Sequence, residues 1–474
     1  MSSLALRLRS GQALRLRSGQ DRLLRHTAVR ETARLCSRAR RASYGEARRS
    51  AEGAKAARVE PTRLLNRNFV LLSQAQLVSQ FGNQAFTIAL TFWTAATTQS
   101  ATMTGLMLMA AVLPLVVLGP LTGTLADRLA SRLRIIVTCD LLSGTIVLLL
   151  ALGFVAGPAA WRPAMLFTAA LLIGVCNAFF DPAVNALAPD LVPRDRIEAA
   201  TAFRQSARQM TALTAQGLGG MLFALVGPAG LFVLDGVSFL VAGATEMLVQ
   251  PPQSTIHNPQ SAIRNPQSAI FSDAAEGFRY VASQPGMINF LIASAVFNAL
   301  LMPITVLLPV YATTYLNADV RWFGFLLAAI SGGALTGCSL AGTMRWSGPS
   351  RRLLLVTALV ALGLALALLG QVQSRWTALA IAFTTGVLAG IINVLMVSIV
   401  QRRASGEFRG RVIALQTMMT RVLVPIGMVG GGAIADLTGR NVPLVYAICG
   451  GTLALTSVIL LAARPTTRAF LASS

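Results

Sequence analysis

The sequence predicts an all-α integral membrane protein with twelve spanning helices in two pseudo-symmetric bundles of six. Three observations lead to this prediction: an apolar composition, a regular series of long apolar segments, and internal similarity between the two halves. The chain has 474 residues, of which 54% are hydrophobic and 12% charged, and its mean hydropathy is +0.63. Such values lie outside the range of soluble proteins. Because backbone groups in lipid must be bonded internally, the spans should be helices.

Twelve apolar segments follow one another along the chain. A hydrocarbon core of about 30 Å needs about 20 helical residues, and each segment meets that length. The predicted spans are 68–93, 102–126, 134–156, 163–188, 201–226, 228–249, 287–316, 321–344, 353–371, 376–400, 410–435 and 441–462.

The polar stretches divide the chain into five parts. They are a basic tail (1–66), a first bundle (67–250), a linker (251–285), a second bundle (286–463) and a short tail (464–474). The first tail repeats ALRLRSGQ in tandem and lacks the apolar mass for a core, so we expect a disordered cytoplasmic extension or sequence upstream of the true start. A transit peptide is the alternative, against which its five acidic residues count.

The positive charge, a formal +22, lies almost entirely on one side of the predicted membrane. Of the 40 Lys and Arg residues, 35 fall in the two tails and in or near the connections after the even-numbered spans. The positive-inside rule then places both termini in the cytoplasm, as expected for a bacterial inner (plasma) membrane protein. The cations therefore indicate topology and contact with anionic lipid on the cytoplasmic face, and no nucleic-acid partner is expected.

The two halves resemble each other. The fifth span contains QGLGGML (216–222) and the eleventh IGMVGGG (426–432), with glycines at matching positions. Small residues at this spacing allow helices to approach closely. Repeats of this kind are typical of transporters that hold a binding site between two bundles.

The stretch GTLADRLASRL (123–133) resembles the signature between the second and third helices of the major facilitator superfamily, with Ala130 and Ser131 in place of the usual Gly and Arg. Three more segments are similar to its enterobactin-exporter and macrolide-efflux-like branch: ALAPDLVPRDRIEAATAF (186–203), LLPVYATTYL (307–316) and VQRRASGEFRGRVIALQTMM (400–419). The resemblance covers residues 68–462.

This charged stretch is the predicted cytoplasmic gate. Asp127 ends the second span, where it can face the N-terminus of the eleventh span near Gly410, since free amides there favour an anion. Arg128 and Arg132 can pair with nearby carboxylates, and the resemblance implies that this contact, with Gly123 in the same motif, closes the gate. The alternative is that these charges only orient a turn.

A polar stripe on the first span predicts a cavity. Ser73, Gln76, Gln80, Asn83 and Thr87 share one helical face, and Asn177, Asp181 and Asn185 share one in the fourth span. Polar groups are costly in lipid, so both stripes should face water or another helix. The family fold implies the same for Asn298 and Asn393. Hydrogen bonding between helices without a ligand is the alternative.

Four ionisable residues inside the spans are candidates for coupling transport to protons: Asp181, Asp235, Asp140 and Arg421. A carboxyl group buried in a membrane can take up and release a proton near neutral pH. Arg421 would be the counter-charge of Asp181. Because Asp181 precedes Pro182, it can instead cap a restarted helix.

The predicted function is secondary active export of a small organic molecule, a drug, macrolide or siderophore, by alternating access and proton antiport. The alternatives are an importer or lipid translocator on the same fold, or a receptor or scaffold that does not transport. No phosphate-binding loop of the form GxxxxGK[ST] occurs, which counts against an ATP-driven pump. No enzyme activity, cofactor or metal is expected.

Overall fold

The computed structural model describes residues 65–128, 132–250, 279, 281–284, 286–343, 348–403 and 409–459, and these residues form helices and short connections without strands. The first bundle consists of α3 (Arg67–Thr98), α4 (Ala101–Arg128), α5 (Arg132–Ala156), α6 (Arg162–Leu187) and α7 (Ile197–Glu246). The second consists of α9 (Met287–Val310), α10 (Val320–Thr343), α11 (Gly348–Gln371), α12 (Arg375–Arg403), α13 (Arg409–Val422), α14 (Val424–Leu437) and α15 (Val442–Ser457). The predicted tails up to residue 64 and from 460, and most of the linker, lie outside the described residues.

The helix α7 contains two of the predicted spans. Its backbone leaves the helical region only at Gly227, where φ is +67°, and Pro228 follows at once. Glycine adopts positive φ without steric cost, and proline is suited to the first turn of a helix. The sharp corner between the spans predicted at 201–226 and 228–249 therefore lies at this pair.

The eleventh span differs from the prediction of one helix over 410–435. It is broken into α13 and α14 at Leu423, just before Pro425. Proline has no N–H for the helical ladder, so the break follows from the sequence. The seventh span also changes geometry near Pro309, since a π-helical turn (Tyr311–Tyr315) continues α9.

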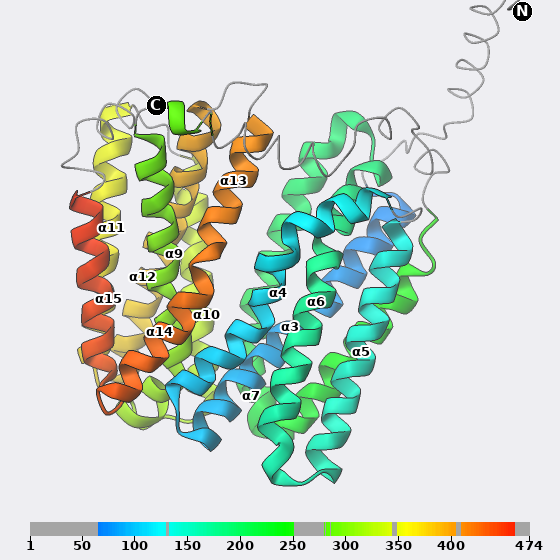
Figure 1. Ribbon diagram of the computed structural model, residues 1–474, viewed down its shortest axis with the longest axis horizontal. Helices are drawn as coiled ribbons and strands as arrows, with labels where there is room; N and C mark the ends of the chain where they lie inside the picture. The colour runs from blue at the N-terminus through cyan, green and yellow to red at the C-terminus, as the bar shows by residue number, and fades with distance from the viewer. Residues whose placement is uncertain are drawn as a thin grey trace, which may run out of the picture. The chain divides into compact units, whose positions relative to one another are not determined.

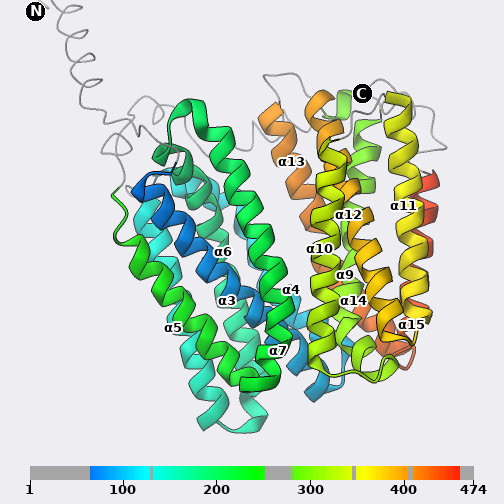
Figure 2. The same cartoon turned by 180° about the vertical axis from the view of Figure 1, so that it is seen from behind.

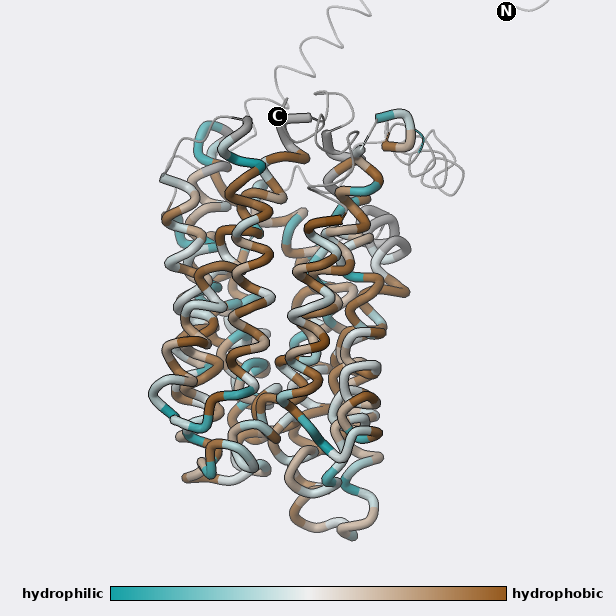
Figure 3. Tube along the Cα trace, turned by 90° about the vertical axis from the view of Figure 1, so that its left-hand side faces the viewer, coloured by the Kyte–Doolittle hydropathy of each residue, from teal (hydrophilic) through white to brown (hydrophobic). Residues whose placement is uncertain are grey.

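The fold class is confirmed. Among the described residues, nine helices are long and apolar enough to cross a membrane; α7 supplies two spans, and the more polar α3 and the shorter α15 complete the twelve. Large apolar side chains such as Leu149, Leu225 and Leu364 are exposed on the outside, as lipid contact requires. Figure 3 shows hydrophobic residues along most of the helices.

Each bundle centres on an apolar cluster, and each cluster also includes residues of the other bundle, such as Ile88 in one and Met428 in the other. In the first, Phe86, Phe154 and Phe232 pack with ring centroids 5.1 to 5.5 Å apart. In the second, Tyr311 and Tyr446 are fully buried, and the Tyr446 hydroxyl donates to the carbonyl of Ile304.

The helix ends define two faces. We call the end where α3 begins and α15 ends the terminal face, and the opposite end the distal face; Figures 1 and 2 show both. Close contacts join the bundles toward the distal face. A Cβ atom at Gly105 of α4 would lie 2.3 Å from the Met428 carbonyl oxygen of α14, and one at Gly220 of α7 would lie 2.6 Å from that of Val320 in α10. Only glycine permits this approach.

Candidate functional site

A polar cavity of about 290 Å³ lies within the first bundle. It is lined by Gln76, Ser79, Gln80, Asn83, Thr87, Ala111, Val112, Leu115, Asp140, Asn177, Phe180, Asp181, Val184, Arg204, Arg208 and Phe239. The structure thus brings the predicted residues of the first and fourth spans around one space. Ser73 and Asn185 are not in this lining; Ser73 is buried and Asn185 exposed.

The second bundle contributes no residue to this cavity. Asn298 of α9 is half-buried, and its side-chain amide donates to the carbonyl of Ser294 in its own helix at 2.9 Å. Asn393 of α12 is exposed. These two predicted cavity residues therefore lie apart from the polar cavity in this conformation.

Two arginines of α7 lie in the cavity wall. An Nη atom of Arg208 lies 3.9 Å from Oδ1 of Asp181, and Nε of Arg204 donates to Oε1 of Gln76 at 3.3 Å. Sequence reasoning missed both because they were counted with the polar connection before the fifth span. Their spacing of four residues inside an apolar segment was the available signal.

Asp181 has Arg208 as its ion-pair partner, and Arg421 is not in contact with it in this structure. Arg421 lies in the last turn of α13 with its side chain exposed. The predicted pairing of Asp181 with Arg421 is therefore replaced here by a pairing with Arg208. The carboxyl group of Asp181 is 38% exposed, so the cavity gives it access to water.

Three acidic side chains are buried in the first bundle. Asp140 of α5 is 2% exposed, and Asp235 and Glu246 of α7 are 0% exposed. Asp140 packs against α7 about one turn before Glu246, since a Cβ atom at Gly243 would lie 3.6 Å from the Cβ atom of Asp140, and Asp140 also lines the cavity. Neither oxygen of Glu246 has a donor among the described residues. The sequence prediction included Asp140 but missed Glu246, which is near the end of its span.

Asp235 occupies a different position. It lies against Gly82 of α3, where a Cβ atom would lie 2.5 Å from its Oδ1, and no described group donates to either of its oxygens. It does not line the cavity. The predicted coupling acids therefore differ in their access: Asp140 and Asp181 reach the cavity and Asp235 does not.

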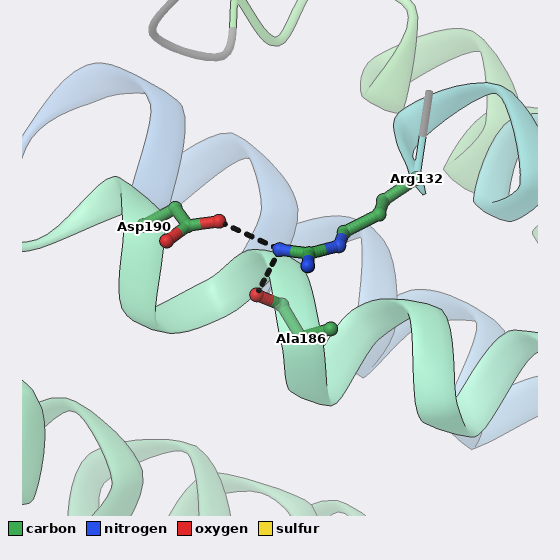
Figure 4. A network of polar contacts seen from close by, with 3 residues as sticks. All are labelled: Arg132, Ala186 and Asp190. Carbon is green, nitrogen blue, oxygen red and sulfur yellow. Dashed lines mark hydrogen bonds and ion pairs between the residues drawn. The ribbon is translucent and has the colours of Figure 1, made fainter. Parts of the chain in front are cut away.

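The charged stretch at the terminal face is described in part. Gly123, Asp127 and Arg128 belong to the last turns of α4, and Gly410 to the first turn of α13, but their side chains lie outside the described part of the structure. Arg132 is described, and Figure 4 shows its contacts: Nη1 donates to Oδ2 of Asp190 at 2.9 Å and to the carbonyl of Ala186 at 3.1 Å. A cation at the C-terminal carbonyls of α6 is favourable.

An interbundle contact that the sequence did not predict lies at the distal face. Asp436, near the end of α14, accepts hydrogen bonds from Oγ of Ser100 (2.6 Å) and the backbone amides of Ala101 and Thr102 (both 2.9 Å). These groups form the N-terminus of α4, whose free amides and partial positive charge favour a carboxylate. Beside it, Arg440 donates to Gln99 at 3.2 Å.

Comparison with known proteins gives one consistent family. The sequence model of the Major Facilitator Superfamily matches residues 72–422 and 344–473. Among curated proteins, macrolide efflux protein A of Streptococcus pyogenes is 22% identical over 379 residues, which cover 79% of this chain and 90% of that protein. The multidrug efflux pump Tap of Mycolicibacterium fortuitum is 26% identical over 392 residues, which cover 78% of this chain and 90% of that protein.

Solved structures show the same fold. The nucleoside transporter NupG superposes with a TM-score of 0.62 at 13% identity, covering 83% of this chain and 98% of its own. A bacterial homologue of the iron transporter ferroportin gives a TM-score of 0.62 at 19% identity, covering 84% of this chain and 99% of its own. With its twelve helices in two bundles and a family match across most of its length, this chain belongs to the major facilitator superfamily.

Proposed function

We propose that this protein is a secondary active exporter that moves a small organic molecule across the bacterial inner membrane by alternating access, in exchange for protons. The observation that carries the proposal is the pairing of a polar cavity with bundles that are held together at their distal ends. Packing of α4 against α14 and of α7 against α10 blocks a path to the distal face. Efflux proteins among the sequence relatives favour export as the direction.

The distribution of cations sets the orientation in this proposal. Positive residues gather at the terminal face, which we therefore assign to the cytoplasm. The described conformation then corresponds to the state that accepts substrate from the cytoplasm. Export requires the distal contacts to open and the charged stretch around Asp127 to close.

Coupling is assigned to the carboxyl pair Asp140 and Glu246. Two neighbouring acids in the interior of a bundle are suited to exchange one proton between them, because a shared proton avoids the burial of two like charges. Asp140 connects the pair to the cavity and hence to water. Asp181 is the second candidate, because its carboxyl group also reaches the cavity but already has Arg208 as a partner.

The test uses inverted membrane vesicles that contain the protein, with an imposed proton gradient and a panel of dyes, siderophores and macrolides. We expect at least one compound to accumulate inside the vesicles, to release protons as it enters, and to lose this behaviour when a protonophore dissipates the gradient. Accumulation that survives the protonophore would contradict proton antiport. Gradient-driven loss of the compound from inverted vesicles would identify an importer instead.

A further inference from the structure

Two arginines of α7 and two acids, Asp140 and Asp181, line the polar cavity. Arg204 and Arg208 lie one helical turn apart on α7, and like charges at this spacing repel. Asp181 lies 3.9 Å from Arg208 and balances that residue. Arg204 has no carboxylate within ion-pair distance in the described part of the chain, although arginine inside a membrane span is costly.

Arg204 also has hydrogen-bond donors to spare. A guanidinium group has five N–H donors, and the contact recorded for Arg204 is a single one, from Nε to Oε1 of Gln76 at 3.3 Å. Its side chain is half-buried and lines the cavity. Within the described part of the chain, no acceptor lies within hydrogen-bonding distance of the Nη atoms of Arg204.

Gln76 adds a second unmet donor. Arginine cannot accept a hydrogen bond, so the Gln76 atom that faces Arg204 must be the carbonyl oxygen, and its Nε2 must lie on the other side. Gln76 is 8% exposed, and its Nε2 has no acceptor among the described residues. A buried donor without a partner is unfavourable by about 1–3 kcal/mol. Both residues thus lack the same kind of group, an acceptor.

Part of the remaining wall is apolar and aromatic. Phe180, Phe239, Leu115 and Val184 face the same cavity as Arg204. A volume of about 290 Å³ accommodates a one- or two-ring molecule or one end of a larger substrate. A ligand that satisfies the site has a flat or aliphatic body and an anionic head with paired oxygens, which matches a guanidinium group in geometry and charge.

We propose that the transported substrate is an amphipathic organic anion whose carboxylate or similar oxyanion binds to Arg204, with Gln76 as a second donor. This inference rests on the proposed function only in treating the cavity as the substrate site. An anion between the two arginines lowers their mutual repulsion, so binding is favoured by the charges that destabilise the empty cavity.

The experiment measures binding by calorimetry to the full chain in phosphatidylcholine nanodiscs, which have no anionic headgroups. The probes are aromatic and aliphatic carboxylates such as 2-naphthoate, each compared with its neutral amide and its amine. We expect at least one acid to bind at least about tenfold more tightly than its amide, as loss of a charged hydrogen bond implies. Arg204→Gln should abolish this preference, and Arg204→Lys should retain part of it.

The matched control is Arg196→Gln, which removes an exposed arginine that pairs with Asp195 outside the cavity, so the acid preference should persist. The proposal is overturned if no acid in the panel binds more tightly than its amide, or if Arg204→Gln binds acids as wild type does. If Arg204→Gln does not fold, the comparison of Arg204→Lys with wild type decides. If acids bind in an Arg204-dependent manner but no compound moves with the proton gradient, the export proposal is refuted and the anion proposal stands. If only neutral or cationic compounds move with the gradient, the anion proposal is refuted and the export proposal stands.

Discussion

Asp436 and Ser100 are joined by a 2.6 Å hydrogen bond although 336 positions separate them in the chain. With the amides of Ala101 and Thr102, this contact attaches the end of α14 to the start of α4. The predicted contact at the other face has the opposite arrangement, since Asp127 ends α4 and Gly410 begins α13. In this prediction, the second and eleventh spans would be joined by a carboxylate at either face in turn.

Replacement of Asp436 should open the distal face. Asp436→Ala removes a charged acceptor for three donors, worth about 1–2 kcal/mol, so the distal-open population should rise about five- to thirtyfold. Labelling of a cysteine at Thr87 by an impermeant maleimide from the distal side, in a background without other cysteines, measures this. Ser100→Ala, which removes one donor, should have a smaller effect.

Asp319→Ala is the control for this variant. It removes an exposed acid that pairs with Arg321 and takes no part in the contact between α4 and α14. Its labelling should equal that of the parent. Equal labelling of Asp436→Ala and the parent would show that the distal contact does not hold the gate.

A methyl group at Gly105 should prevent tight distal closure. Its Cβ atom would lie 2.3 Å from the carbonyl oxygen of Met428, so α4 and α14 must separate, and such overpacking costs about 1–3 kcal/mol. We expect Gly105→Ala to slow substrate transport severalfold and to increase distal labelling. Gly119→Ala lies on the same helix with nothing within 4 Å of its Cβ atom, and it should transport normally.

Loss of the charge at Asp127 should have the reverse consequence. Asp127→Asn weakens the predicted contact with the N-terminus of α13 and favours the state open at the terminal face, while the fold is retained. A cysteine at Gln80 should then react faster with a reagent applied from that side. Unchanged labelling from both sides would restrict Asp127 to the formation of a turn.

Neutral replacements of the buried carboxyl groups should separate coupling from binding. Asp140→Asn and Glu246→Gln keep side-chain size but cannot exchange a proton, so gradient-driven transport should fall at least about tenfold while counterflow exchange of substrate continues. Asp181→Asn provides the comparison. If it alone abolishes proton release in inverted vesicles, coupling belongs to Asp181 and the assignment to Asp140 and Glu246 is wrong.

The fold was predictable because a bilayer imposes a length and an apolar composition on every span. Periodicity likewise indicated that Gln76, Gln80 and Asn83 share a face, since helical geometry fixes that relation locally. Contacts between distant helices were not predictable in this way. The contacts of Asp436 with α4 and of Arg204 with Gln76 depend on how helices pack, and a pattern within one helix does not contain that information.

Charge counting also concealed part of the site. Arg204 and Arg208 support the topology argument when they are counted as loop cations, yet the structure places both inside α7 in the cavity wall. Glu246 is near the end of its predicted span, where charged residues are common and do not by themselves indicate a site. The packing of the helices, and not the sequence, places these residues in the cavity wall or the bundle interior.

The break between α13 and α14 has a consequence for the transport cycle. Pro425 has no N–H to donate to the carbonyl of Arg421, so the eleventh span lacks one backbone hydrogen bond at this position. Bending there changes a few backbone dihedrals without the loss of another hydrogen bond. The distal part of this span, α14, can therefore remain bound to α4 while the terminal part, α13, changes its angle relative to it.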